Sequence, residues 1–412
     1  MKFENYSISS EIKHNLDLLG FKRPTDIQFK SIPNILKGED VLAIAQTGTG
    51  KTAAFAIPVL NILQDRLRNR RTEGVKCIVM VPTRELGIQI TEVFKLLGRK
   101  TGVETFCVFG GVEQGPQIAK LQDGIDILVT TPGRMFDLVS QGHLLLHRVE
   151  ILILDEADHM LDLGFIKDIR DLLKFLPKRR QTLFFSATIN ANIKKLAYSL
   201  VNNNAIRIQL SPDDPVTQNV EHSVAFVDMD DKRFFLERLI NEHPDEKIIV
   251  FVRTKVRAER VLKAMERVEI SAATIHSDKE QKDRFTVMDR FKSGELKVLI
   301  ATDVSARGID FPHVQYVVNY DLPDKAENYV HRIGRTGRGK ERGFAVSFCS
   351  PEEQEMLKEI EGFITKKIKV MELSNSEYQK TVDFSQDAST SLKELMQEAE
   401  AFENRKKKKR KK

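Results

Sequence analysis

Short apolar runs with the length of buried strands alternate with segments of helical periodicity over most of this chain. In the first half of the chain these runs lie at 41–45, 77–81, 105–109, 127–130, 151–154 and 182–185. Strands that alternate with helices predict a parallel sheet with helices on both faces. The pattern therefore favours an α/β fold built from parallel strands.

The alternation breaks around residues 202–219, where asparagine, proline and aspartate favour turns. It resumes with apolar runs at 222–227, 247–252, 272–275, 297–300, 314–319 and 344–348. A chain of 412 residues is long enough for two domains of ordinary size. We therefore expect an N-terminal region 1–29, an α/β domain over 30–208, a linker at 209–218, a second α/β domain over 219–373 and a terminal segment 374–412.

The terminal segment is polar, and we expect a flexible connector through Thr390 followed by a short amphipathic helix. Residues 405–412 form a run of eight lysines and arginines. Without this run, 57 basic residues remain against 59 acidic ones, so the net charge of +6 belongs largely to the tail. Nucleic-acid binding by the folded body therefore has to be argued from local sites.

The sequence shows no membrane span or signal peptide, and its cysteines do not have the spacing of metal ligands. No apolar stretch approaches the ~18 residues of a membrane span, and the first residues lack the apolar core of a signal peptide. Each of the three cysteines, Cys77, Cys107 and Cys349, lies in an apolar run without a Cys or His at metal-ligand spacing. We expect buried free cysteines and a cytoplasmic protein.

A glycine-rich stretch, Ala45-Gln46-Thr47-Gly48-Thr49-Gly50-Lys51-Thr52, lies between an expected strand and an expected helix. Glycines in this position let backbone amides surround phosphate oxygens at a helix N-terminus, with the lysine at the β- and γ-phosphates and the hydroxyl on Mg²⁺. The strict pattern has glycine where this chain has Ala45, so a glycine-rich turn without a ligand is the alternative. The Gly-Lys-Thr sequence between strand and helix favours the nucleotide loop.

The acidic quartet Asp155-Glu156-Ala157-Asp158 follows the apolar run 151–154. Taken alone, it is also typical of a helix N-terminus, where acidic side chains complement the helix dipole. Open α/β sheets, however, bind ligands at the carboxyl ends of their strands. A nucleotide loop also requires an acidic residue on a nearby strand for Mg²⁺, which fits Asp155. Glu156 then fits the general base that orients the attacking water.

Together these residues resemble the DEAD-box RNA helicase family, in a compact bacterial-type form, from Phe3 to about Phe348. The acidic quartet is the namesake of the family, which commonly has alanine at position 45. Phe3 and the stretch Gly20–Gln28 resemble its Q motif. The resemblance implies two tandem RecA-like domains, ATP and Mg²⁺ as cofactors, and RNA as the partner.

The resemblance also implies roles for single residues. Phe21 is expected to stack on adenine and Gln28 to hydrogen-bond its edge. Residues 305–310 resemble motif V, in which Asp310 meets the ribose, and residues 331–338 resemble motif VI. Negative charge develops on the γ-phosphate in the transition state, and an arginine guanidinium can stabilise it. The implied catalytic residues are Lys51, Asp155, Glu156, Arg335 and Arg338. The implied Mg²⁺ ligands are Thr52 and Asp155. The implied nucleotide-binding residues are Phe21, Arg23, Gln28, Gln46, Thr47, Gly48, Thr49, Gly50, Lys51, Thr52, Gly308 and Asp310.

Short polar segments at strand ends can contact phosphates and sugars without reading bases. In the family such segments bind the RNA backbone, which implies that role for Arg84, Gly110, Gly111, Thr131, Arg134, Arg253, Thr254, Gln281, Arg284 and Thr302. The stretch 186–188 resembles the motif that links the acidic quartet to strand separation, and coupling is implied for Asp158, Ser186, Thr188, His331 and Arg332. One departure is His276-Ser277, where the family usually has His-Gly, and we expect an altered loop geometry there.

We expect a monomeric, RNA-stimulated ATPase whose domains close on ATP and RNA and separate short RNA duplexes locally or remodel RNA–protein complexes. An ATP-gated RNA clamp or assembly scaffold with little unwinding is the alternative. A DNA helicase on the same plan is weaker, because the Q motif and the acidic quartet point to RNA. For the tail, residues 391–412 with the basic run at 405–412, we expect nonspecific RNA anchoring, and a solubilising or purely disordered end is the alternative.

Overall fold

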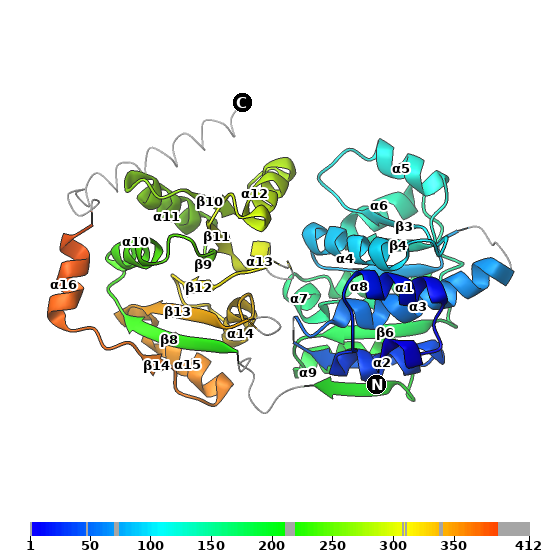
Figure 1. Cartoon of the computed structure of the whole chain (residues 1–412). Coiled ribbons are helices and arrows are strands. Elements are labelled where there is room, and N and C mark those ends of the chain that lie inside the picture. The colour runs from blue at the N-terminus through cyan, green and yellow to red at the C-terminus, as the bar shows by residue number, and fades with distance from the viewer. Residues whose placement is uncertain are drawn as a thin grey trace. The chain divides into compact units, whose positions relative to one another are not determined.

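The computed structural model describes residues 2–46, 48–69, 74–210, 219–306, 309, 311–337 and 341–385 (Figure 1). These residues form two compact units, and the chain passes from the first to the second within residues 211–218. The predicted linker 209–218 lies outside the described residues except for its first two positions. Each unit is built around its own seven-stranded sheet, which confirms the predicted α/β fold.

The sheet of the first unit is parallel, with strand order β3-β4-β2-β5-β6-β1-β7. Six of its strands coincide with predicted apolar runs. The seventh, β7, lies where the prediction placed a break, because Arg207 and Gln209 are exposed and only Ile208 between them is buried. The strands are β1 (Val41–Ala45), β2 (Cys77–Met80), β3 (Thr105–Val108), β4 (Ile127–Thr130), β5 (Ile151–Leu154), β6 (Gln181–Ser186) and β7 (Ile206–Leu210).

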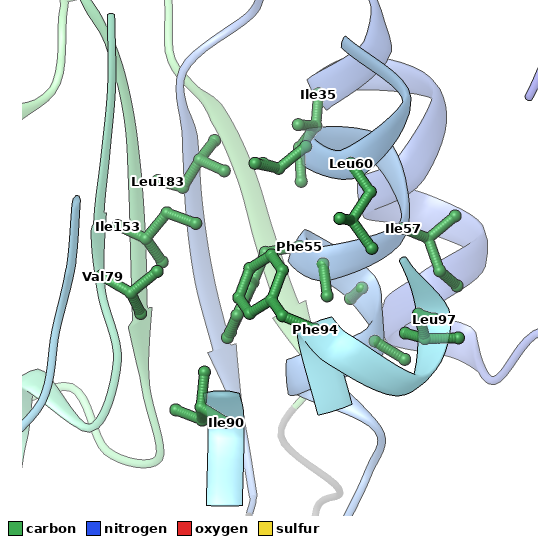
Figure 2. Close-up of a cluster of buried hydrophobic side chains, with 14 of the residues drawn as sticks. Ile35, Phe55, Ile57, Leu60, Val79, Ile90, Phe94, Leu97, Ile153 and Leu183 are labelled. Atoms are coloured by element: carbon green, nitrogen blue, oxygen red, sulfur yellow. The ribbon is translucent and has the colours of Figure 1, made fainter. Parts of the chain in front are cut away.

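Alternate residues of these strands pack into two hydrophobic clusters, one on each face of the sheet. Figure 2 shows the first cluster, where Phe55 and Phe94 from helices pack over Val79, Ile153 and Leu183 from strands. One face is covered by η1 (Phe3–Asn5), α1 (Ser10–Leu18), α2 (Asp26–Leu36), α3 (Lys51–Asn69) and α4 (Arg84–Leu97). The other is covered by α5 (Gly115–Gln122), α6 (Pro132–Ser140), α7 (Ala157–Asp162), α8 (Ile166–Phe175) and α9 (Ala191–Leu200).

The N-terminal region is tied to the first unit by polar as well as apolar contacts. The amide of Asn15 donates to the carbonyls of Leu97 and Arg99 at 2.9 and 2.8 Å, and the backbone N–H of Ser9 donates to Asn61 at 2.8 Å. Ile12 and Leu16 are buried in the same cluster as the sheet. Residues before Lys30 therefore share the core of the first unit.

The sheet of the second unit has the order β10-β11-β9-β12-β13-β8-β14 and is also parallel. Its last strand, of two residues, was not predicted. The strands are β8 (Val220–Phe226), β9 (Ile248–Val252), β10 (Ala272–Ile275), β11 (Val298–Thr302), β12 (Tyr316–Asn319), β13 (Gly343–Cys349) and β14 (Lys369–Val370). Its helices are α10 (Lys232–Glu242), α11 (Lys255–Arg267), α12 (Gln281–Ser293), α13 (Asp303–Ala306), α14 (Ala326–Ile333), η2 (Pro351–Glu353), α15 (Gln354–Ile364) and α16 (Asn375–Asp383).

Helix α16 corrects the prediction of a flexible connector that begins at residue 374. A capping box of Ser374 and Glu377 starts this helix. The hydroxyl of Tyr378 donates to Asp231 at 2.8 Å, and its ring lies 4.9 Å from that of Phe235 on α10. The helix is therefore part of the second unit. The predicted amphipathic helix and the basic run lie outside the described residues.

Two expectations drawn from composition can be compared with the structure. The three cysteines are free and buried, as predicted. Within the part of the chain that the structure describes, no helix is both long enough and apolar enough to cross a membrane.

Candidate functional site

The glycine-rich loop joins β1 to α3 in a conformation that only glycine adopts readily. Gly48 and Gly50 have φ of 81° and 92°, in the left-handed region that side chains avoid. The hydroxyl of Thr49 donates to the carbonyl of Gln46 at 2.7 Å and closes the turn. Lys51 is the first residue of α3, so the loop ends at a helix N-terminus, where phosphate is favoured. Thr47 lies outside the described residues.

Lys51 is the strongest sign that this loop receives an anion. Only 7% of the residue is exposed, and its Nζ has no hydrogen-bond partner within the described part of the chain. A buried ammonium without a partner is costly. A phosphate group at the loop supplies the missing charge and acceptors, so these residues fit the phosphates of a nucleotide.

The Q-motif segment contacts the loop through Gln28. Its Oε1 accepts from the backbone N–H of Thr25 at 3.0 Å, as in a capping box, and its Nε2 donates to the carbonyl of Gly50 at 3.1 Å. Phe21 is half-buried and packs edge-to-face against Phe3, with ring centroids 6.2 Å apart. Arg23 is exposed.

Asp155 and Glu156 follow β5, two strands away from β1 in the sheet. Burial raises the pKa of the Asp155 carboxyl to about 6, and the nearby ammonium of Lys51 opposes this rise. Glu156 has φ of 51° and ψ of 48°, an unfavourable conformation for a residue with a side chain. Its N–H donates to Asp155 Oδ1 at 3.0 Å. The strained turn holds two buried carboxylates side by side.

A divalent cation at this place would need few protein ligands. Over the described ranges no group of three or more His, Cys, Asp or Glu side chains is arranged to hold a metal. Mg²⁺ usually takes one or two carboxylates together with substrate phosphates and water. Asp155 and the hydroxyl of Thr52, which follows Lys51 on α3, fit that donor set.

The last carboxylate of the quartet contacts the segment after β6. Asp158 Oδ2 accepts from the hydroxyl of Thr188 at 3.2 Å, and Ser186 donates to the carbonyl of Thr188 at 2.8 Å. Three of the residues with an implied coupling role, Asp158, Ser186 and Thr188, are therefore in contact. His159, on the same helix, lies 3.6 Å from Glu156, measured from Nδ1 to Oε2.

The candidate RNA-binding residues of the first unit gather at the carboxyl ends of β2, β3 and β4, which are neighbours in the sheet. The guanidinium of Arg84 lies so close to Gly111 that a Cβ at that position would collide with it. Arg134, on α6, donates to the carbonyl of Val112 at 2.9 Å. The remaining members, Gly110 and Thr131, follow β3 and β4.

In the second unit the corresponding residues follow β9, end the neighbouring strand β11, or begin α12. Thr254 caps α11 by accepting from the N–H of Arg257 at 3.1 Å. Thr302 donates to Ser305 at 3.3 Å. Gln281 and Arg284 occupy the first turn of α12.

The motif VI residues have unequal environments. Arg332 is buried and holds Asp303 with two contacts of 2.5 and 2.8 Å, while its Nη1 donates to Asn319 and to the carbonyl of Asp321. Arg332 therefore ties the start of α13 to α14. Arg335 is also buried, and its Nε donates to the carbonyl of His331 at 3.1 Å. Gly308, Asp310 and Arg338 lie outside the described residues.

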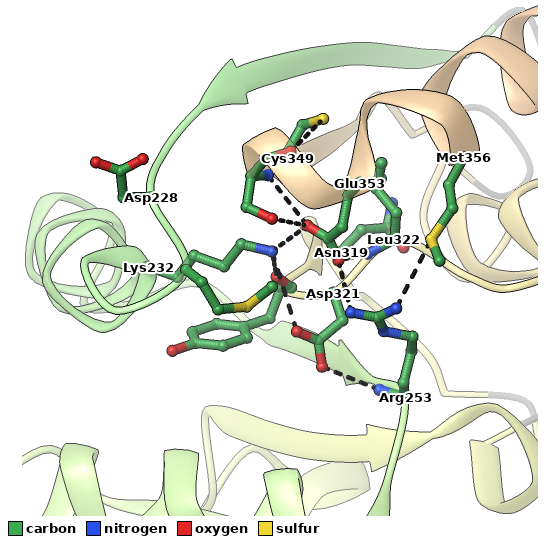
Figure 3. A network of polar contacts seen from close by, with 12 residues as sticks. Asp228, Lys232, Arg253, Asn319, Asp321, Leu322, Cys349, Glu353 and Met356 are labelled. Atoms are coloured by element: carbon green, nitrogen blue, oxygen red, sulfur yellow. Dashed lines mark hydrogen bonds and ion pairs between the residues drawn. The ribbon is translucent and has the colours of Figure 1, made fainter.

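Two polar groups were missed by the sequence analysis. Lys232, at the start of α10, is fully buried and lies against Glu353 and the carbonyl of Tyr320 (Figure 3). On α11, Glu259 binds His276 at 2.7 Å. Ser350 and Glu353 form a capping box, which is a local pattern, whereas no local pattern pairs the Glu353 carboxylate with a lysine 121 positions earlier.

Comparison with known proteins shows which family the chain resembles. The chain matches the family model described as DEAD/DEAH box helicase over residues 25–196 and the helicase conserved C-terminal domain over residues 231–340. It is 40% identical over 373 residues to the ATP-dependent RNA helicase RhlB of Shewanella frigidimarina, covering 90% of this chain and 86% of that protein. It is 41% identical to the protein of the same name from Xanthomonas oryzae, of which it spans 65%, less than two thirds.

Solved structures of RNA-bound proteins are also similar to this chain. Dbp5 of S. cerevisiae bound to RNA and ADP BeF3 aligns with a TM-score of 0.81 at 29% identity, covering 92% of this chain and 99% of that one. The DEAD-box helicase Mss116 bound to ssRNA and UDP-BeF aligns with a TM-score of 0.83 at 27% identity, covering 95% of this chain and 83% of that one. Both are similar to this chain over both of its sheets.

Proposed function

The chain belongs to the DEAD-box family of ATP-dependent RNA helicases, and we propose that it couples RNA-stimulated ATP hydrolysis to local separation of short RNA duplexes or remodelling of RNA–protein complexes. The observation that carries the proposal is the buried Lys51 at the end of the glycine loop and near Asp155, whose ammonium has no hydrogen-bond partner among the described residues. These groups match the phosphates and the Mg²⁺ of a nucleotide. The printed names of the relatives, and the RNA and nucleotide in the two similar structures, support it.

In this proposal Lys51 would bind the β- and γ-phosphates, and Thr52 and Asp155 would hold Mg²⁺, which would neutralise phosphate charge. Glu156 orients the attacking water, since its strained turn fixes the carboxylate next to Asp155. Arg335 and Arg338 of the second unit complete the charge stabilisation when the two units close. Gly308 and Asp310 complete the nucleotide pocket.

RNA binds, in the proposal, along the strand ends that carry Arg84, Arg134 and Arg253 through backbone contacts that are largely independent of sequence. A site that needs both units to be complete makes ATP and RNA binding cooperative, because each ligand favours the closed state. Asp158 and Thr188 link the acidic quartet to that closure. The cytoplasmic location and the monomeric state inferred from the sequence stay predictions.

The experiment is the substitution Glu156→Gln in the full chain. We expect ATP turnover to fall by about 10²–10⁴-fold, the usual contribution of a positioned general base. ATP affinity should persist, because Lys51 and Asp155 are retained. Turnover is measured with saturating RNA and affinity with a fluorescent ATP analogue; unchanged turnover would refute the role of Glu156.

Strand displacement separates this function from the RNA clamp. In a single-turnover assay with wild-type protein, duplex release should accompany ATP hydrolysis. Under multiple-turnover conditions, in which the enzyme must recycle, duplex release should be absent in the Glu156→Gln variant. Hydrolysis without any displaced strand would favour the clamp or scaffold.

A further inference from the structure

Glu353, at the end of η2, holds together residues that are distant in the sequence. Its carboxylate is 1% exposed, and its Oε2 lies against the Nζ of Lys232 (Figure 3). Its Oε1 accepts from Nη2 of Arg253 and from the N–H of Leu322, both at 3.1 Å. The N–H of Ser350 donates to Oε2 at 3.1 Å. Both oxygens of this buried carboxylate are therefore satisfied by the fold.

Arg253 is the partner of Glu353 that remains accessible. It follows β9, and 26% of its side chain is exposed. A guanidinium has five N–H donors in a rigid plane, and the bond to Glu353 occupies one of them. The other contacts of the Arg253 guanidinium are weak, because its Nη1 lies 3.7 Å from the sulfur of Met356 and 3.8 Å from Asp324, which is itself 73% exposed. The guanidinium is therefore fixed at one edge and has donors left for an anion.

Each of the two buried carboxylates in the surrounding network lies close to two cations. Three cations, Lys232, Arg253 and Arg257, face two buried carboxylates, Glu353 and Asp321. Lys232 is fully buried, and burial lowers the pKa of its ammonium while Glu353 raises it. Among the described residues, Glu353 is the one carboxylate within hydrogen-bond distance of Lys232. The buried ammonium therefore holds Glu353 in the position from which it contacts Arg253.

We propose that Glu353 is a positioning residue for RNA binding: it orients the guanidinium of Arg253 toward an RNA phosphate, with Lys232 holding Glu353 in place. The inference rests on the proposed function, in which Arg253 contacts the RNA backbone, and it adds a residue that does not itself touch RNA. It also gives the buried ion pair of Lys232 and Glu353 a role other than stabilising the fold, because a buried ion pair does not by itself make a protein more stable.

The test is a double-mutant cycle in the full chain with Arg253→Ala, Glu353→Gln and the two together. RNA affinity is measured with a nonhydrolysable ATP analogue by fluorescence anisotropy of a labelled single strand over a range of salt concentrations. Loss of a hydrogen-bonded phosphate contact should weaken binding about tenfold and reduce the salt slope by about 0.7. Glu353→Gln should show the same two changes in part, and the double variant should be no weaker than Arg253→Ala.

A double variant in which both members of the buried ion pair are neutral distinguishes a positioning role of Glu353 from a role in folding. In Lys232→Met with Glu353→Gln, both buried charges are removed, so the second unit should unfold at a temperature near that of the wild type while RNA affinity stays low. Asp324→Asn is the matched control, since its carboxylate is exposed and 3.8 Å from Arg253, and its RNA affinity should not change.

The outcomes distinguish the inference from the function on which it rests. If Arg253→Ala binds RNA normally, Arg253 is not an RNA contact and the inference falls with that assignment, whereas the ATPase role of Glu156 is unaffected. If Arg253→Ala weakens binding but the effects of the two substitutions multiply, Glu353 acts independently of Arg253 and the inference is overturned alone. Recovery of RNA affinity in the neutral double variant would also overturn it, because Glu353 would then matter only for folding.

Discussion

Gly50 decides, at the scale of a single residue, whether the nucleotide loop and the Q-motif segment fit together. Its φ of 92° is strained for any other residue, and a Cβ built on it would lie 2.5 Å from Nε2 of Gln28. Alanine at this position must therefore displace Gln28 from the carbonyl of Gly50 as well as strain the backbone. We expect Gly50→Ala to weaken ATP binding at least tenfold, measured with a fluorescent ATP analogue.

Gly124 offers a matched control for that substitution. Its φ of 93° is nearly the same, but a Cβ there meets no atom within 4 Å. Both alanine variants should lose about 1–2 kcal/mol of stability from the left-handed backbone, and only Gly50→Ala should lose nucleotide affinity. Equal ATP affinity in the two variants would show that the contact between Gly50 and Gln28 is unimportant.

Single residues also show where sequence reasoning about the site reached its limit. Asp158 and Thr188, which are in contact, were both assigned to coupling because both belong to recognisable motifs. The half-buried position of Phe21 was not predicted, because its neighbour Phe3 lies 18 positions away and no local pattern pairs them. Glu353 shows the same limit, since its capping box is a local signal but its contacts with Lys232 and Arg253 depend on the sheet that brings three segments together.

At the scale of whole elements, the predictions succeeded where the strands are buried on both faces. The run Ile151–Leu154 is buried throughout and was predicted with its exact bounds. Strand β7 was missed because it lies at an edge and exposes Arg207 and Gln209. Helix α16 was missed although Ser374 and Glu377 carry the capping-box signal, because few apolar residues follow them.

The contact between α11 and β10 gives a prediction about pH. Glu259 on α11 accepts from Thr274 at 2.7 Å and lies 3.0 Å from Lys279, in addition to its bond with His276. The hydrogen bond from His276, followed by those from Thr274 and Lys279, lowers the pKa of Glu259 to about 2 despite opposing desolvation. The folded state therefore holds fewer protons on this carboxyl than the unfolded state.

A depressed carboxyl pKa contributes stability that is fully present above the unfolded value of about 4.3 and is lost as pH falls toward the folded value. Glu259→Gln should therefore lower the free energy of unfolding of the second unit by about 1–3 kcal/mol at pH 7 and by clearly less at pH 3. Urea unfolding at both pH values measures this free energy.

Glu355→Gln on the exposed face of α15 is the control, since its partner Lys358 is also exposed. It should change the free energy of unfolding little at either pH. A constant loss for Glu259→Gln across this range would contradict the assignment.

At the scale of the whole molecule, the two units repeat one plan with different chemistry at the strand ends. Both sheets have seven parallel strands, and in both the polar side chains gather at the carboxyl ends of neighbouring strands. The first unit carries the glycine loop and the acidic quartet, whereas the second carries the arginines of motif VI. Because neither set is sufficient for hydrolysis in the proposed mechanism, the coupling to RNA has to come from the approach of one unit to the other.

The basic run at 405–412 adds a charge that the folded body lacks, since the rest of the chain is close to neutral. If the run anchors RNA, each phosphate that it neutralises on a single strand contributes about −0.7 to the slope of log affinity against log salt. Deleting 405–412 should therefore flatten the salt dependence of RNA affinity and leave the basal ATPase rate unchanged, because every residue assigned to hydrolysis precedes position 339. Replacing the run by eight alternating glycines and serines controls for chain length and should flatten the slope equally. An unchanged slope in both variants would assign the run to solubility instead of RNA anchoring.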